Sequence, residues 1–159
     1  MTTHTTTEAA KLAKVTVATI REWIRIGAVV ATKTAGKWAI TADSLTARIA
    51  IGRELAAERI ARRAAQITEL ADFAAYKDQG KARDNVFNLI ADGALIPLID
   101  GCYLVVSKTT EHLTYIVNTA DQACDCKGHS NWGRCSHLTA ANAIEAYRGN
   151  TRPRLALVA

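Results

Sequence analysis

Three cysteines and one histidine lie close together in the last third of the sequence. They are Cys124, Cys126, Cys135 and His137, with the spacing C-x-C-x8-C-x-H. Thiolate sulfur and imidazole nitrogen are ligands that zinc accepts together, and four of them close its tetrahedral shell. The spacing therefore predicts one structural Zn²⁺ ion, which holds the backbone together and leaves no open position for a reaction.

Alternative roles exist for these cysteines and for the residues near them. A disulfide needs an oxidising compartment. Residues 1–8 do not resemble an export signal, so a disulfide between these cysteines is not expected. The fourth cysteine, Cys102, lies on a different predicted element and is expected to be a small core residue. His129 could replace His137, but the four-ligand pattern already closes without it. Asp125 is expected to be solvated or to support a ligand.

The backbone must bend to bring the two ligand pairs together. Alternate residues of a flat strand lie roughly 6.6 Å apart, too far for two sulfurs on one zinc, so each pair must lie on a kink. Gly128 and Gly133 allow the loop between the pairs to bend. Ser136 is the predicted N-cap of a helix over 138–147, which places His137 in its first turn.

This motif resembles a SWIM-type zinc finger. The resemblance covers about residues 103–147, from a strand-like Tyr115-Ile116-Val117 to an alanine-rich helix, and all four ligand positions match. We expect the module to contact DNA or a partner protein.

Composition and charge narrow the class of protein. The 159 residues allow one domain or two small ones, and the net charge is +5. Residues 1–63 hold eleven Lys/Arg against five Asp/Glu (+6), and residues 64–159 hold nine against ten (−1). A basic first part indicates nucleic acid binding, although basic faces are also often simply solvated. With no apolar run near ~20 residues and no signal peptide, we expect a cytoplasmic protein without a membrane segment, from a bacterial cell or a phage-infected host.

Two short helices are predicted at the start of the chain. Thr6 or Thr7 can cap the first. Thr16 caps the second, which runs over 17–26 and ends at Gly27. Two short helices joined by a tight turn, the second carrying arginines, indicate a helix-turn-helix.

A β-hairpin is predicted next, from β-rich runs over 28–33 and 37–40 around a turn at Thr34-Ala35-Gly36. Thr41 or Asp43 can cap a following helix. Trp23 and Trp38 are expected to be core residues.

The succession of these elements resembles the winged helix-turn-helix of MerR-type and excisionase-type DNA-binding proteins over about residues 5–50. The residues that carry the resemblance are Thr7-Glu8-Ala9-Ala10-Lys11-Leu12, Val15-Thr16, Thr19-Ile20-Arg21-Glu22-Trp23-Ile24, Gly27 and Gly36-Lys37-Trp38-Ala39-Ile40. The resemblance implies that double-stranded DNA is the partner.

The same resemblance implies a set of contact residues. Thr16, Val17, Ala18 and Arg21 would enter the major groove, Arg25 would reach phosphate, and Lys33 and Lys37 would touch the DNA backbone from the wing. Val17 and Ala18 can meet a thymine methyl group but cannot read guanine, so Arg21 must supply most of the direct readout.

A long helix is predicted in the middle of the chain, because residues 53–78 contain neither Pro nor Gly and are rich in Ala, Glu, Arg and Leu. Its apolar residues keep near-heptad spacing for about two heptads. MerR-type proteins pair through such a helix, which implies a homodimer. Packing of the same stripe against the chain's own zinc module is an equal alternative. Gln79-Gly80-Lys81 is the predicted break.

The rest of the chain predicts a small module around the metal. A helix is expected over 84–91, and strands over 95–99 and 102–106 flank a turn at Asp100-Gly101. A third strand, over 113–118, leads to the first ligand pair. Because both faces of 102–106 are apolar, this strand is expected to be central and buried. About eighty residues bury only a modest core, so the metal should be needed for folding.

The prediction is therefore an α+β protein with three parts: a winged helix-turn-helix (1–50), a linking helix (51–80) and a zinc-finger module (81–159). We expect a DNA-binding transcriptional regulator or an excisionase-like architectural factor. The alternative is a protein-protein adaptor that uses the zinc module and has a degenerate helix-turn-helix. An enzyme is not expected, because four ligands close the zinc shell.

Overall fold

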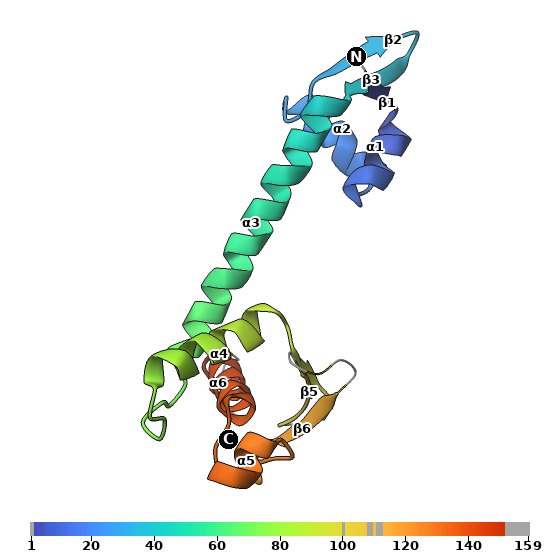
Figure 1. The fold of residues 1–159 in the computed structure, drawn as a ribbon. Coiled ribbons are helices and arrows are strands. Elements are labelled where there is room, and N and C mark those ends of the chain that lie inside the picture. The colour runs from blue at the N-terminus through green and yellow to red at the C-terminus, as the bar shows by residue number, and fades with distance from the viewer. Residues whose placement is uncertain (1, 100, 108–109, 111–112, 152–159) are drawn as a thin grey trace, which may run out of the picture. The chain divides into compact units, whose positions relative to one another are not determined.

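The structure is a computed structural model that describes residues 2–99, 101–107, 110 and 113–151, and it mixes helices with strands (Figure 1). The chain divides into two compact units, Met1–Glu58 and Arg59–Ala159, whereas the sequence analysis divides it after residues 50 and 80. Each unit has its own hydrophobic core. None of the helices in the described ranges has both the length and the apolar character needed to cross a membrane.

The first unit contains two short helices, a small sheet and the beginning of a long helix. Its elements are β1 (Thr3–His4), α1 (Thr6–Ala13), α2 (Val17–Arg25), β2 (Ala31–Thr34), β3 (Lys37–Thr41) and the first part of α3 (Ala42–Thr68). Their core includes Ala9, Ile20, Ile40 and Leu45.

The two short helices begin at threonine caps. Thr16 caps α2 as predicted, and Gly27 lies just beyond its end with φ 71°. The predicted cap of α1, at Thr6 or Thr7, is wrong. Thr5 is the cap: its hydroxyl accepts from the Glu8 backbone N–H at 3.3 Å, and the Glu8 carboxylate accepts from the Thr5 N–H at 2.8 Å. The reciprocal pair depends on a glutamate three residues after the cap.

The predicted hairpin is present, with β2 and β3 antiparallel. Ala35 and Gly36 at its turn both have positive φ, 49° and 80°, as a two-residue hairpin turn requires. The strand β1 was not predicted; it pairs with β3 on the side opposite β2. Both tryptophans are half-buried: Trp23 packs against the core, as predicted, whereas Trp38 is not among the residues that pack against it.

Helix α3 differs from the prediction in both bounds. One helix runs through Ala42–Thr68, where a short helix and a separate one over 53–78 were expected. The helix ends at Thr68, whose hydroxyl donates to the Ala64 carbonyl at 2.8 Å in the last turn, and Phe73 beyond it is buried in the second core. The break predicted at Gln79-Gly80-Lys81 is also wrong, because a new helix begins at Gln79.

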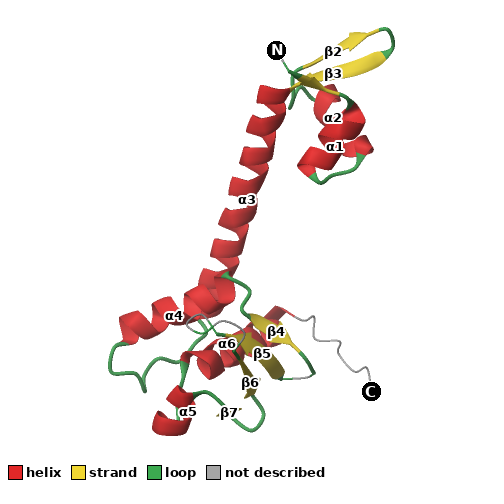
Figure 2. Cartoon of the chain, turned by 45° about the vertical axis from the view of Figure 1, so that its right-hand side comes forward, coloured by secondary structure: helices red, strands yellow, loops and turns green. Residues whose placement is uncertain are grey.

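In the second unit, the helix Ser136–Thr151 packs against an antiparallel sheet and also against the helix Gln79–Ala91 (Figure 2). Its elements after α3 are α4 (Gln79–Ala91), β4 (Leu95–Pro97), β5 (Cys102–Val106), β6 (Thr114–Asn118), β7 (Ala123–Cys124), α5 (Lys127–Trp132) and α6 (Ser136–Thr151). The strand order is β4-β5-β6-β7.

The strand β5 is internal to this sheet, as predicted, but only one of its faces is fully covered. Tyr103 and Val105 are buried in the core, whereas Val106 is 42% exposed. Gly101 precedes the strand with φ 72°, and Asp100 of the predicted turn lies outside the described residues.

Candidate metal centre

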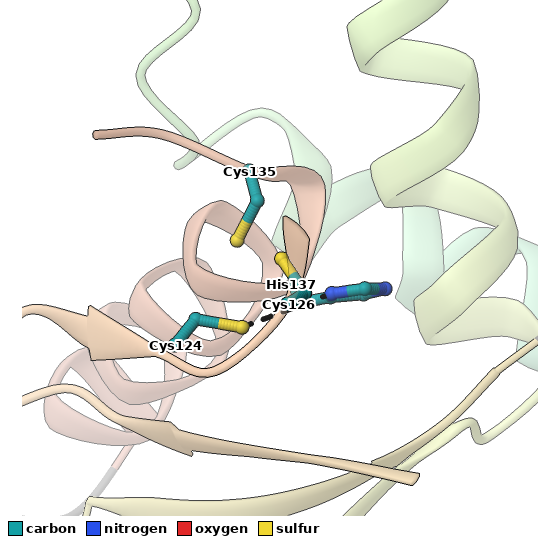
Figure 3. A group of neighbouring side chains, drawn as sticks. All are labelled: Cys124, Cys126, Cys135 and His137. Carbon is teal, nitrogen blue, oxygen red and sulfur yellow. Dashed lines mark hydrogen bonds between the residues drawn. The ribbon is translucent and has the colours of Figure 1, made fainter. Parts of the chain in front are cut away.

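The four predicted ligands form one group in the second unit (Figure 3). The ligand atoms of Cys124, Cys126, Cys135 and His137 all lie within 4.8 Å of one another, and Cys124 Sγ is 3.8 Å from His137 Nδ1. Around a tetrahedral zinc ion, with bonds of about 2.0–2.3 Å, ligand atoms are separated by roughly 3.5–3.8 Å. The group is therefore of the right size to hold one metal ion.

Cys124 is placed by the sheet. It ends β7 and is paired with Val117 of β6. At the next residue the chain leaves the strand, and the Asp125 carboxylate takes over part of the pairing: Oδ1 accepts from the Ile116 N–H at 2.9 Å, while the Asp125 N–H donates to the Ile116 carbonyl at 3.3 Å. Asp125 thus fixes the kink that the C-x-C spacing predicts, and it supports the ligands without joining them.

Cys126 and Cys135 are placed by the ends of two helices. Cys126 Sγ accepts from the His129 N–H at 3.4 Å at the start of α5, and Cys135 Sγ accepts from the Leu138 N–H at 3.4 Å at the start of α6. The predicted N-cap at Ser136 is therefore wrong, because the sulfur one residue earlier takes that role. Backbone donors at a helix N-terminus favour the thiolate form that binds metal.

The short helix α5 was not predicted, since the loop was expected only to bend at two glycines. Gly133 behaves as expected: it ends α5 in the left-handed region, with φ 64°. Gly128 lies inside the helix, and a Cβ there would be 3.6 Å from Cys135 Cβ, an ordinary contact distance. Sequence analysis missed the helix because cysteine is not among the usual N-cap residues.

His137 is the histidine that completes the group, as predicted. Its ring stacks on Tyr115 with centroids 5.0 Å apart. Burial lowers the pKa of His137, which favours the neutral imidazole that coordinates metals. His129 is outside the group, and its buried Nδ1 atom has no hydrogen-bond partner in the described part of the chain.

The buried thiols need a cation to ionise. Burial raises the pKa of both Cys124 and Cys135. A divalent ion supplies the compensating charge that allows these thiols to lose their protons. Cys102 lies outside the group, as expected, but it is only half-buried on β5 and is not part of the core, so its predicted role as a small core residue is wrong.

The seven residues predicted to contact DNA all lie in the first unit. Thr16, Val17, Ala18, Arg21 and Arg25 are on α2 or its cap, Lys33 is on β2 and Lys37 is on β3, and all except the half-buried Val17 are exposed.

Arg25 is the one of these residues that is held in an ion pair: it donates to the Glu22 carboxylate through Nε at 2.7 Å and Nη2 at 2.5 Å. A phosphate contact by Arg25 would have to share or replace this pair.

No protein-family model, curated protein or solved structure matches the chain significantly.

Proposed function

We propose that the chain is a DNA-binding protein, either a transcriptional regulator or an excisionase-like architectural factor, whose second unit is built around one structural Zn²⁺ ion. The observation that carries the DNA-binding part is the arrangement of the first unit. There, α1 and α2 are joined by a tight turn at Lys14, and a hairpin follows them.

The zinc part of the proposal is supported by the chemistry of the donors. Three sulfurs and one imidazole nitrogen form a soft, four-membered set, which suits zinc better than the hard cations that prefer oxygen ligands. Because four protein ligands fill a tetrahedral shell, the ion has a structural role in this proposal.

The DNA part is supported by what α2 presents to solvent. Ala18 and Arg21 are exposed one turn apart, next to the Thr16 cap, so one face of the helix offers a small residue and a guanidinium group. A guanidinium can donate two hydrogen bonds to one guanine in the major groove. Arg21 has no ion pair with any described residue, so this group is available.

Arg21→Ala tests this function. Loss of a bidentate base contact should weaken binding to a selected duplex site by ~1–3 kcal/mol and relax specificity at one position. The site is first selected from a random duplex pool with the full chain at stated salt, and affinity is then measured by gel-shift titration. Arg53→Ala, another exposed arginine of the first unit, is the matched control. Equal affinity of Arg21→Ala and the parent would remove Arg21 from base readout.

A second candidate, a protein-protein adaptor, is favoured by one specific observation. The Glu22 carboxylate occupies Arg25, and Glu22 also brings negative charge to the face that would approach phosphate. A salt titration of binding to random duplex DNA separates the two functions, since phosphate contacts make affinity fall steeply with salt. A flat response, or no binding at low salt, favours the adaptor.

A further inference from the structure

Trp132 is exposed to an unusual degree for an indole. It is the last residue of α5, and 70% of its surface is accessible. In the described range 119–150, no other large hydrophobic residue is exposed to a comparable extent. Exposed tryptophan is uncommon, because burying its ring is strongly favourable, and it is enriched where proteins bind partners.

The residues around Trp132 are polar or cationic. The segment between the ligand pairs, 127–134, contains two exposed cations, Lys127 and Arg134, and no acidic residue. Three thiolates and a divalent ion would sum to −1, and the exposed Asp125 next to the segment adds another −1, so the two cations balance the negative charge beside them. The guanidinium carbon of Arg134 lies 6.0 Å from the centroid of the Tyr76 ring, at the outer limit of a cation–π contact.

The backbone fixes the position of this surface. The Cys126 sulfur caps the start of α5, the Ser130 hydroxyl donates to the Cys126 carbonyl at 3.2 Å, and the Gly133 N–H donates to the His129 carbonyl at 2.8 Å. In the view of Figure 2, α5 lies at the outer edge of the second unit. A metal ion bound by Cys126 and Cys135 would hold both ends of the segment, so the indole would be presented on a rigid support.

We propose that Lys127, Trp132 and Arg134, the knuckle surface, bind single-stranded nucleic acid. An unpaired base stacks on the indole, and neighbouring phosphates lie beside the two cations. Stacking on an exposed aromatic ring together with cationic backbone contacts is the general chemistry of single-strand binding. This inference deepens the proposed function, because it gives the zinc module its own class of partner, and it rests on that function only in needing the metal-bound fold.

Duplex DNA is a poorer occupant of this surface. The faces of paired bases are covered by their neighbours in the helix, so an indole can stack only on a base that has left the stack. A protein partner is also less well matched. Protein hot spots place tryptophan inside a desolvated apolar patch, whereas Trp132 is followed by Gly133 and preceded by the exposed Ser130 and Asn131.

The test measures binding of the zinc-loaded full chain to fluorescently labelled 12-nucleotide oligo-dT and oligo-rU by anisotropy, at low and moderate salt. Trp132→Ala should weaken binding by about tenfold or more, because one stacked base is lost. Trp132→Phe keeps an aromatic ring and should lose much less. The control is Ile116→Ala, which removes a 54% exposed side chain from the outer face of the sheet of the same unit and should change nothing.

The outcomes are separable. If the chain binds oligo-dT and oligo-rU equally well, it recognises the base and phosphate groups that DNA and RNA share. A preference for one oligonucleotide shows whether single-stranded DNA or RNA is the partner. Equal affinity of Trp132→Ala and the parent, or no binding of either oligonucleotide at low salt, overturns the proposal, and a protein partner becomes the better occupant. Because duplex binding is assigned to α2, Arg21→Ala should leave single-strand binding intact. A parent chain that binds the oligonucleotides but binds no duplex DNA would therefore count against the proposed function and not against the knuckle surface.

Discussion

At the scale of single residues, two of the candidate ligand sulfurs have two roles, as helix caps and as members of the ligand group. Cys126 and Cys135 accept backbone N–H groups at the starts of α5 and α6, and they also point toward the other ligands. A metal ion held by this group would lie at the N-termini of α5 and α6, whose backbone N–H groups would compensate part of the negative charge of three thiolates. This arrangement explains how the C-x-C and C-x-H spacings each make a bend.

The choice between the two histidines gives the first test at this scale. His137→Ala should reduce zinc affinity by about two orders of magnitude or more, since an apparent binding free energy of ~10–16 kcal/mol is shared among four ligands. His129→Gln should keep one zinc per chain, because His129 is outside the ligand group. Competition with a chromophoric chelator measures both affinities. Loss of zinc from His129→Gln with retention by His137→Ala would reverse the assignment.

The sequence was enough to predict that the four candidate ligands lie together, but not how the residues next to them are arranged. The four ligands could be identified from sequence because so few residue types bind soft cations and their spacing is short. The role of Asp125 as a substitute strand partner could not, because it depends on the register between β6 and β7. The exposure of Trp132 likewise depends on α5, a helix whose cap is a cysteine.

At the scale of elements, a capping box decides where α1 begins. Thr5 and Glu8 form a capping box, although Thr6 and Thr7 are equally good cap residues by type. The sequence presents three consecutive threonines, and only the reciprocal bond to Glu8 selects among them.

Thr5→Ala should lower the free energy of unfolding of the first unit by about 1 kcal/mol, because the α1 N-terminus loses its side-chain acceptor. Thr7→Ala, a change inside the helix at an exposed position, is the matched control and should be near neutral. Urea unfolding in a Trp132→Phe background, followed by the fluorescence of the two first-unit tryptophans, of which Trp23 packs against this core, reports the difference. A larger loss for Thr7→Ala would contradict the capping box.

Strands were easier to predict than the long helix. The hairpin of β2 and β3 follows from local turn chemistry at Ala35-Gly36, which needs no knowledge of the rest of the chain. The bounds of α3 follow from tertiary contacts instead. Gly52 does not interrupt it, since one glycine costs a helix only about 1 kcal/mol. Its end is set by the burial of Phe73, which outweighs the helix propensity of the residues after Thr68.

At the scale of the whole molecule, the two units differ in what holds them together. The first has a core of its own made only of side chains such as Ile20, Ile40 and Leu45. In the second, three of the buried core residues are the ligands Cys124, Cys126 and Cys135. Removing the metal would leave these thiols neutral and unlinked at the centre of the core, so the second unit should depend on the ion far more than the first.

The most direct test of the account is metal removal followed residue by residue. Purified chain should contain one equivalent of zinc. After chelation, hydrogen exchange should show loss of amide protection in the second unit, for example at Val105 of β5, while Ile40 of β3 stays protected. Restoring zinc should restore protection. Purified chain without zinc, or unchanged protection of Val105 after complete chelation, would contradict the central claim that a metal ion organises the second unit.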